Sequence, residues 1–130
     1  MSMIRSIMKF LATFLVLVVI LEHFFIMILE MFMIPSRLAK KSFGLSYDFM
    51  AQKQVQTLFS NQGLYNGFLA TGLLWAYFIA PQIVQFQASI LFLSFVLIAG
   101  LWGAYTSNKA ILIKQGLPAL LAILILCLSQ

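Results

Sequence analysis

Charged residues are scarce in this 130-residue sequence, and acidic ones are the rarest. It has three Asp or Glu, one His and eight Lys or Arg, so charged residues make up 8%. A soluble domain carries about 25% charged and roughly 45–50% apolar residues, whereas here 63% are hydrophobic. A small soluble fold always leaves a large surface exposed and could not hide this apolar content. The composition therefore favours a single integral membrane domain spanning residues 1–130.

Cysteine is almost absent, and so are the usual catalytic motifs. The single Cys127 excludes an intrachain disulfide and provides no zinc spacing. No nucleotide-binding glycine loop or nucleophile elbow is present. We therefore expect no cofactor and no metal. The basic residues lie at the ends of apolar segments rather than in a stripe, so the expected partner is the lipid bilayer and not nucleic acid.

Long apolar runs dominate what is present. Each is long enough to cross a bilayer, which takes about 20 residues, and they cover residues 7–33, 58–80, 86–105 and 110–128. Pro35 and Pro81 follow the first two runs and favour a helix end there. Pro118 falls inside the fourth run and predicts a kink near 114–118. The sequence predicts an all-α, up-down four-helix membrane bundle. A secretory signal at the N-terminus fits the sequence less well than a spanning helix does, because no cleavage site follows the first run.

The segment 35–59 between the first two runs is the one sizeable loop. It predicts a short interfacial helix that runs into the second span, with Gly44 as a turn and Asp48 as an N-cap. Lys and Arg near the ends of the spans number six on the side of this loop and two, Arg5 and Lys9, on the other. This asymmetry predicts that both termini lie outside and that the basic loop is cytoplasmic.

Three ionisable residues lie within the first run: Glu22, His23 and Glu30. A charge at the bilayer centre costs on the order of 2.5–3.5 kcal/mol, so such groups usually face protein or water. His23 and Glu30 share a helix face, with Glu22 on its flank. Because low dielectric disfavours charge, we predict that these groups exchange protons near neutral pH. A copper site with Met27 and Met31 and a purely structural role in helix pairing are the alternatives.

Polar residues at the start of the second run are the expected partners of these groups. An antiparallel hairpin would bring them level with Glu30 and place Thr71 near His23. The candidate substrate-binding residues are Asn61, Gln62, Tyr65, Asn66, Thr71 and Gln115. Gly63 and Gly67 form a small-residue pair that we expect on another face of this helix. The outer half of the bundle is expected to be almost pure hydrocarbon.

Several segments together resemble a known family. They are Glu30-Met31, Phe43-Gly44-Leu45, Asn61 to Ala70, Ala99-Gly100 and Gln115 to Ala119. These segments are similar to those of small bacterial membrane proteins catalogued as a domain of unknown function (1304). The resemblance implies a four-helix protein of the bacterial inner membrane, and no established activity. Small multidrug resistance transporters are similar only in architecture.

Three functions remain open at this point. The first is a proton- or cation-coupled transporter of a small molecule, working as a homo-oligomer because four helices barely enclose a cavity. The second is a membrane enzyme in which Glu30 and His23 act as acid and base on a lipid-soluble substrate. The third is a non-catalytic subunit of a membrane complex. The absence of long soluble loops favours the first, and the sequence does not identify the substrate.

Overall fold

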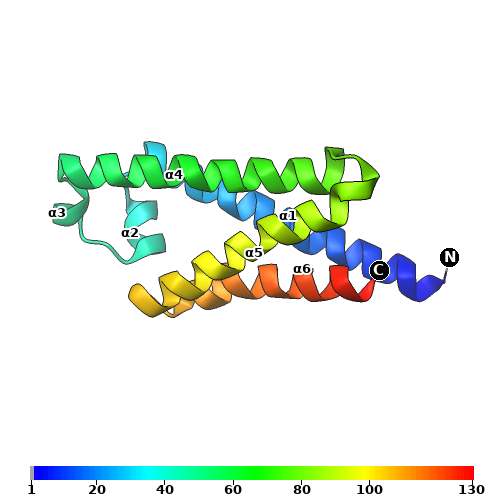
Figure 1. Ribbon diagram of the computed structural model, residues 1–130. Coiled ribbons are helices and arrows are strands. Elements are labelled where there is room, and N and C mark those ends of the chain that lie inside the picture. Colours follow the sequence, from blue (N-terminus) through cyan, green and yellow to red (C-terminus); the bar gives the residue numbers. More distant parts are fainter. Residues whose placement is uncertain (1) are drawn as a thin grey trace.

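The computed structural model describes residues 2–130 and contains only helices over that range. Figure 1 shows long helices lying side by side, with both chain ends at one end of the molecule and two short helices at the other. The bounds are α1 Met3–Phe32, α2 Arg37–Phe43, α3 Tyr47–Met50, α4 Lys53–Leu74, α5 Gln82–Thr106 and α6 Leu117–Leu128, with π-helical segments η1 Trp75–Ile79 and η2 Leu112–Gly116. The prediction of an all-α fold is confirmed.

Two of these helices are long and apolar enough to cross a membrane. They are α1 and α5, and 112–128 forms a shorter apolar helix. The remaining long helix, α4, begins with a polar stretch from Lys53 to Gln56 that lowers its hydropathy. The structure is therefore consistent with a membrane location.

The loop after α1 differs from the single interfacial helix that the sequence predicts. It forms two short helices, α2 and α3, and residues 53–57 already belong to α4. Gly44 ends α2 with a φ of 68°, which is the left-handed conformation that glycine adopts without steric cost. The predicted N-cap Asp48 is wrong. Ser46 caps α3 by accepting from the backbone N–H of Phe49 at 3.1 Å, because its side chain lies one position before the first turn.

The last helix departs from regular α-helical geometry just before Pro118, and the kink predicted near 114–118 stays a prediction. The chain from Leu112 to Gly116 is π-helical, and α6 starts directly after it with Pro118 in its first turn. A π turn holds one extra residue, which accommodates the ring and the missing N–H of proline. A second π segment, η1, ends α4 just before Pro81 and was not predicted.

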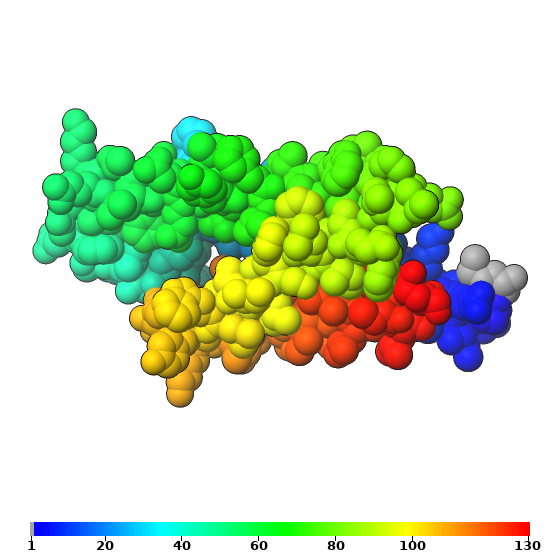
Figure 2. Space-filling view, viewed as in Figure 1, coloured from blue at the N-terminus to red at the C-terminus, as the bar shows by residue number. Residues whose placement is uncertain are grey.

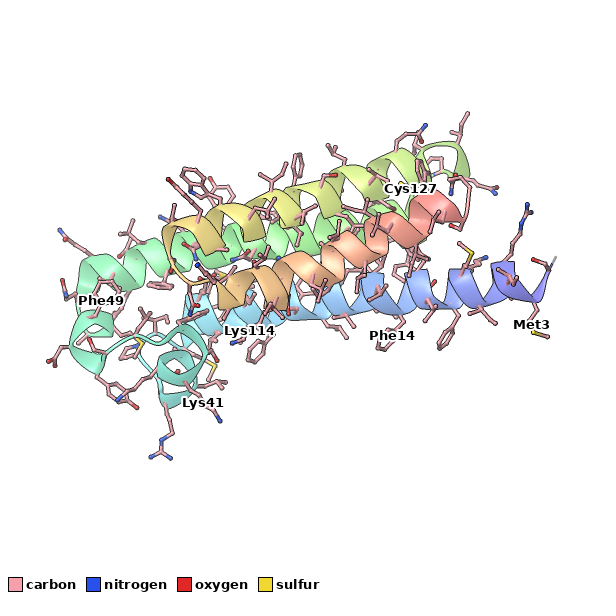
Figure 3. The ribbon with its side chains drawn as sticks, turned by 90° about the horizontal axis from the view of Figure 1, so that it is seen from below. Met3, Phe14, Lys41, Phe49, Lys114 and Cys127 are labelled. Atoms are coloured by element: carbon pink, nitrogen blue, oxygen red, sulfur yellow. The ribbon has the colours of Figure 1, made fainter. Side chains whose placement is uncertain are left out.

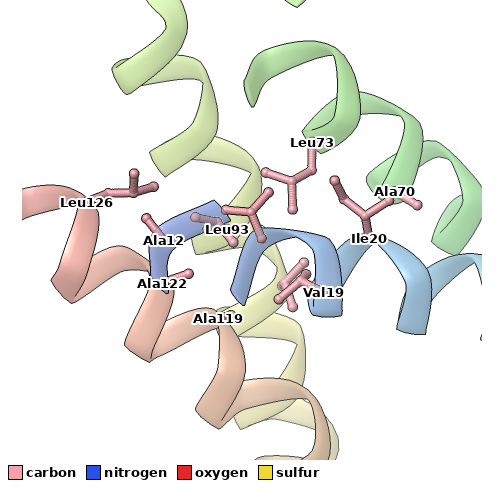
Figure 4. Packing of buried hydrophobic residues seen from close by; sticks show 11 residues of the cluster. Ala12, Val19, Ile20, Ala70, Leu73, Leu93, Ala119, Ala122 and Leu126 are labelled. Atoms are coloured by element: carbon pink, nitrogen blue, oxygen red, sulfur yellow. The ribbon is translucent and has the colours of Figure 1, made fainter. Parts of the chain in front are cut away.

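The hydrophobic core lies where the four long helices meet. Figure 2 shows α5 lying between α4 and α6 on one face, and α1 packs most extensively against α4 and next against α6. Figure 4 shows the centre of this core, where small and large side chains alternate. The cluster comprises Ala12, Val16, Val19, Ile20, Ala70, Leu73, Leu93, Val96, Ala119, Ala122 and Leu126. A smaller cluster of Leu29, Ala39 and Met50 attaches α2 and α3 to the end of α1.

Candidate functional site

The Glu30 carboxyl is the best-defined polar group inside the bundle. It lies in the last turn of α1 and only 1% of the residue is exposed. The side-chain amide of Gln62 donates to Oε2 at 2.6 Å, and that of Asn66 donates to Oε1 at 2.7 Å. Gln62 and Asn66 are one turn apart on α4 and therefore point the same way. Each carboxyl oxygen thus has its own amide donor.

A pair of glycines on α4 makes this arrangement possible. A Cβ atom at Gly63 would lie 2.9 Å from Glu30 Cβ and 3.0 Å from the Met27 carbonyl oxygen, closer than folded proteins tolerate. A Cβ at Gly67 would overlap the side chain of Met27. The expectation that these glycines use another face is wrong. They face α1 beside the amides, and their lack of side chains lets the two backbones approach within reach of a Glu–Gln hydrogen bond.

His23 and Glu22 do not join Glu30 at the α4 amides. His23 is 1% exposed, and its Nδ1 lies 2.9 Å from the Val19 carbonyl oxygen one turn back. A carbonyl oxygen only accepts, so Nδ1 carries the proton of this bond. Glu22 Oε1 is buried and has no hydrogen-bond partner among residues 2–130. The charge of Lys114 in η2 acts on Glu22. Glu30 and His23 therefore have different hydrogen-bond partners, and the buried oxygen of Glu22 has none.

Several of the predicted binding residues lie away from Glu30. Tyr65 is 68% exposed and contacts the ring of Phe68 at a centroid distance of 5.9 Å. Asn61 and Thr71 are also exposed. Gln115 is half-buried in η2, where its backbone adjoins Gly100 of α5. Of the six predicted residues, the structure brings only Gln62 and Asn66 to Glu30.

The residues considered for copper are used in helix packing. The side chains of Met27 and Met31 pack against Gly67 and Gly63 of α4. Among residues 2–130, no group of three or more His, Cys, Asp or Glu side chains is placed to hold a metal ion.

A second polar region lies at the opposite end of the bundle and was missed. The outer half is not pure hydrocarbon: a cavity of about 480 Å³ opens there between α1, η1 and α5. The hydroxyls of Thr13 and Tyr77 are 2.7 Å apart within it. The sequence contained a signal for this site, because Gln82, Gln85 and Ser89 recur at helical spacing and so share one face of α5.

Comparison with known proteins assigns the chain to a family of unknown function. Residues 17–127 match the family described as "Protein of unknown function (DUF1304)", and the chain belongs to that family. The chain is 38% identical over 117 residues to "Uncharacterized protein YpaA" of Lactococcus lactis subsp. lactis (strain IL1403). That match covers 90% of this chain and 97% of the relative. No solved structure matches the chain.

Proposed function

We propose that this protein is a four-span membrane protein in which the Glu30 carboxyl couples proton or cation movement to transport of a small molecule. The observation that carries the proposal is the full burial of Glu30 between two side-chain amides. An ionisable group inside a membrane helix is costly, and such groups mark ion and proton pathways.

The surface of the bundle supports four spans rather than two. Large apolar side chains are exposed on every long helix, among them Phe14 on α1, Phe68 on α4, Phe95 on α5 and Leu124 on α6. An apolar surface that surrounds the molecule suits contact with lipid. Residues 58–79 measure about 33 Å and residues 112–128 about 26 Å as helices, close to the roughly 30 Å hydrocarbon core.

The distribution of basic residues supports an orientation for this bundle. Figure 3 shows Lys41 and Lys114 in the half of the molecule opposite the half that holds Met3 and Cys127. Arg37, Lys40, Lys53 and Lys109 follow the same pattern along the chain, because they belong to α2, the start of α4 and the turn after α5. By the positive-inside rule this end is cytoplasmic and both termini lie outside.

The chemistry of the amides suits a group that gains and loses a proton. A carboxylate accepts from two N–H donors, as Glu30 does with Gln62 and Asn66. A protonated carboxyl must donate its O–H, and an amide that rotates by half a turn presents its oxygen to receive it. The same carboxylate and amide oxygens would also ligate a hard cation. The site can therefore stabilise either state without new residues.

The filled core supports function as a homo-oligomer. Leu73 and Leu93 are 0% exposed and close the interior of a single chain between the two polar regions. A path for a small molecule would then run between copies or require the helices to separate.

The test is transport by protein reconstituted in liposomes under a pH gradient. A panel of small organic cations, anions and neutral solutes is screened for flux, and internal pH is followed with a trapped dye. We expect that Glu30→Gln abolishes solute-dependent proton flux. Asp48→Asn is the matched control, because it removes one carboxylate that is exposed on α3 and should transport normally.

The outcomes separate the remaining functions. Equal flux in Glu30→Gln would contradict a coupling role for Glu30. Solute flux that depends on Glu30 but moves no protons would indicate coupling to a cation instead. Turnover of an extracted lipid without any flux would indicate a membrane enzyme. Copurification of one fixed partner, with neither flux nor turnover, would indicate a subunit of a membrane complex.

A further inference from the structure

The outer cavity has the features of a ligand-binding site that is separate from Glu30. It measures about 480 Å³ and lies at the end of the molecule where the chain termini lie. Its lining combines hydroxyl, amide, ammonium and aromatic groups from α1, η1, α5 and the end of α6. These residues are Lys9, Thr13, Tyr77, Phe78, Gln82, Gln85, Phe86, Ser89 and Gln130. A pocket of this size accommodates a small organic molecule.

Ser89 provides an unused donor at this cavity. The residue is 1% exposed, and its Oγ has no hydrogen-bond partner among the described residues. A serine within a helix often satisfies its hydroxyl on the carbonyl one turn back, but Ser89 does not bond Gln85 in this way. Buried polar groups are nearly always paired, so an unpaired hydroxyl in a cavity wall indicates a missing ligand or water.

The charge of the lining selects the sign of that ligand. Lys9 is the one charged side chain among the lining residues. The acidic side chains are elsewhere: Glu22 and Glu30 lie about four and six turns after Lys9 along α1, and Asp48 is in α3. A cation beside a pocket without carboxylate side chains favours an anionic ligand.

The remaining walls select a partly apolar molecule. Tyr77, Phe78 and Phe86 contribute aromatic surface, and the cavity lies at the margin of the bundle beside exposed Ile83 and Phe10. Aromatic side chains near the ends of membrane helices suit molecules that have one polar and one apolar part.

We propose that this cavity binds an amphipathic organic anion, with its carboxylate or phosphate near Lys9 and its apolar chain along the aromatic wall. Ser89, Gln82 and the second N–H of the Gln85 amide, whose nitrogen already donates to the Ala80 carbonyl oxygen at 2.9 Å, supply hydrogen bonds to the polar part. The carboxylate of a fatty acid and the phosphate of a lysophospholipid share this chemistry. The proposal does not depend on transport through Glu30, because binding is measurable in a protein that transports nothing.

The experiment is native mass spectrometry of the purified full chain released from a neutral detergent. Oleate and lysophosphatidic acid are added separately, and oleamide serves as an uncharged molecule with the same chain as oleate. We expect one bound molecule of at least one anion and none of oleamide at the same concentration. The anion that is retained identifies whether carboxylate or phosphate is the preferred headgroup.

Variants then locate the site. Loss of one interfacial cation in Lys9→Gln should weaken anion binding about fivefold, and loss of one hydrogen bond in Ser89→Ala should weaken it by about the same factor. Lys109→Gln is the matched control, since it removes an exposed cation at the opposite end and should bind as the unaltered protein does. Both test positions leave the Glu30 contacts intact.

Four results would overturn the proposal. They are equal retention of oleamide and oleate, no retention of either anion, unchanged anion binding in both Lys9→Gln and Ser89→Ala, and equal weakening by Lys109→Gln. The last would show that anions associate through overall charge rather than at this cavity. Normal anion binding by Glu30→Gln, together with absent transport, would separate this site from the proposed transport role.

Discussion

The two polar regions of the bundle differ in whether their buried polar groups have hydrogen-bond partners. At the α1–α4 contact, the Glu30 carboxyl is fully buried, and both of its oxygens accept hydrogen bonds. At the outer end, Ser89 is equally buried but lines a cavity and has no partner. Satisfied polar contacts in a low-dielectric interior fix one arrangement of helices, whereas unsatisfied ones leave binding capacity unused. The first region is built for a defined internal geometry and the second for an external molecule.

The largest effect should come from the apolar layer that separates the two regions. Leu93 of α5 is 0% exposed within it. Leu93→Ala should lower the free energy of unfolding by about 2–5 kcal/mol, because the surrounding side chains close only partly over the cavity. Unfolding in mixed detergent micelles, followed by circular dichroism, measures this change. Leu91→Ala, at a residue that is 51% exposed, should change it little, and a similar loss there would contradict the assigned core.

Adding a side chain at the close helix contact should come next. Gly63→Val would place atoms against Glu30 Cβ and the Met27 carbonyl oxygen. We expect a loss of about 3 kcal/mol, since overpacking forces the helices apart, together with loss of the hydrogen bond from Gln62. The same unfolding measurement applies. Leu64→Val, on the exposed face of α4, is the control. Stability equal to that of the control would mean that the helices do not approach so closely.

Removing one amide donor should have a smaller effect. Asn66→Leu leaves Glu30 Oε1 without its partner, and an unsatisfied buried acceptor costs about 2 kcal/mol. The midpoint of detergent unfolding reports the loss. Asn61→Leu removes an exposed amide of the same helix and should stay within about 0.5 kcal/mol of the original. Equal effects of the two substitutions would remove the distinction between these amides.

The smallest effect on stability should come from the cavity. Ser89→Ala removes a buried hydroxyl that has no partner, so the unfolding free energy should change by less than about 0.5 kcal/mol or rise slightly. The measurement is the same as for Asn66→Leu. A clear loss of stability would show that the hydroxyl already has a structural partner, and the contrast between the two regions would fail.

Much of the helical layout could be predicted from the sequence because its signals are local. Apolar runs and the positions of Pro35 and Pro81 define where helices extend and end, and α1, α5 and the boundaries near Pro81 follow them. The N-cap of α3 was misplaced because Ser46 and Asp48 are both good capping residues and lie two positions apart. Local preference alone does not choose between them.

The candidate site was predicted only in part because helical spacing defines faces but not rotation. Gln62 and Tyr65 are separated by about 60° around α4, and Asn66 and Tyr65 by about 100°. One broad polar arc therefore contains all three residues. Gly63 and Gly67 decide which edge of this arc meets α1, because only their side permits close approach. The outer cavity depends on α1, η1 and α5 converging, and no spacing within one helix reveals that convergence.

The two π-helical segments have a consequence for how these regions could change state. Tyr77 of the outer cavity lies in η1, and Lys114, which interacts with Glu22, lies in η2. A π turn stores one residue more than an α turn. If the π turn shifts along the chain, each side chain that it passes rotates by about 100° around the helix axis. The axis itself stays in place. A point where the backbone can be rewound therefore adjoins the outer cavity at η1, and a second one at η2 carries the charge that acts on Glu22.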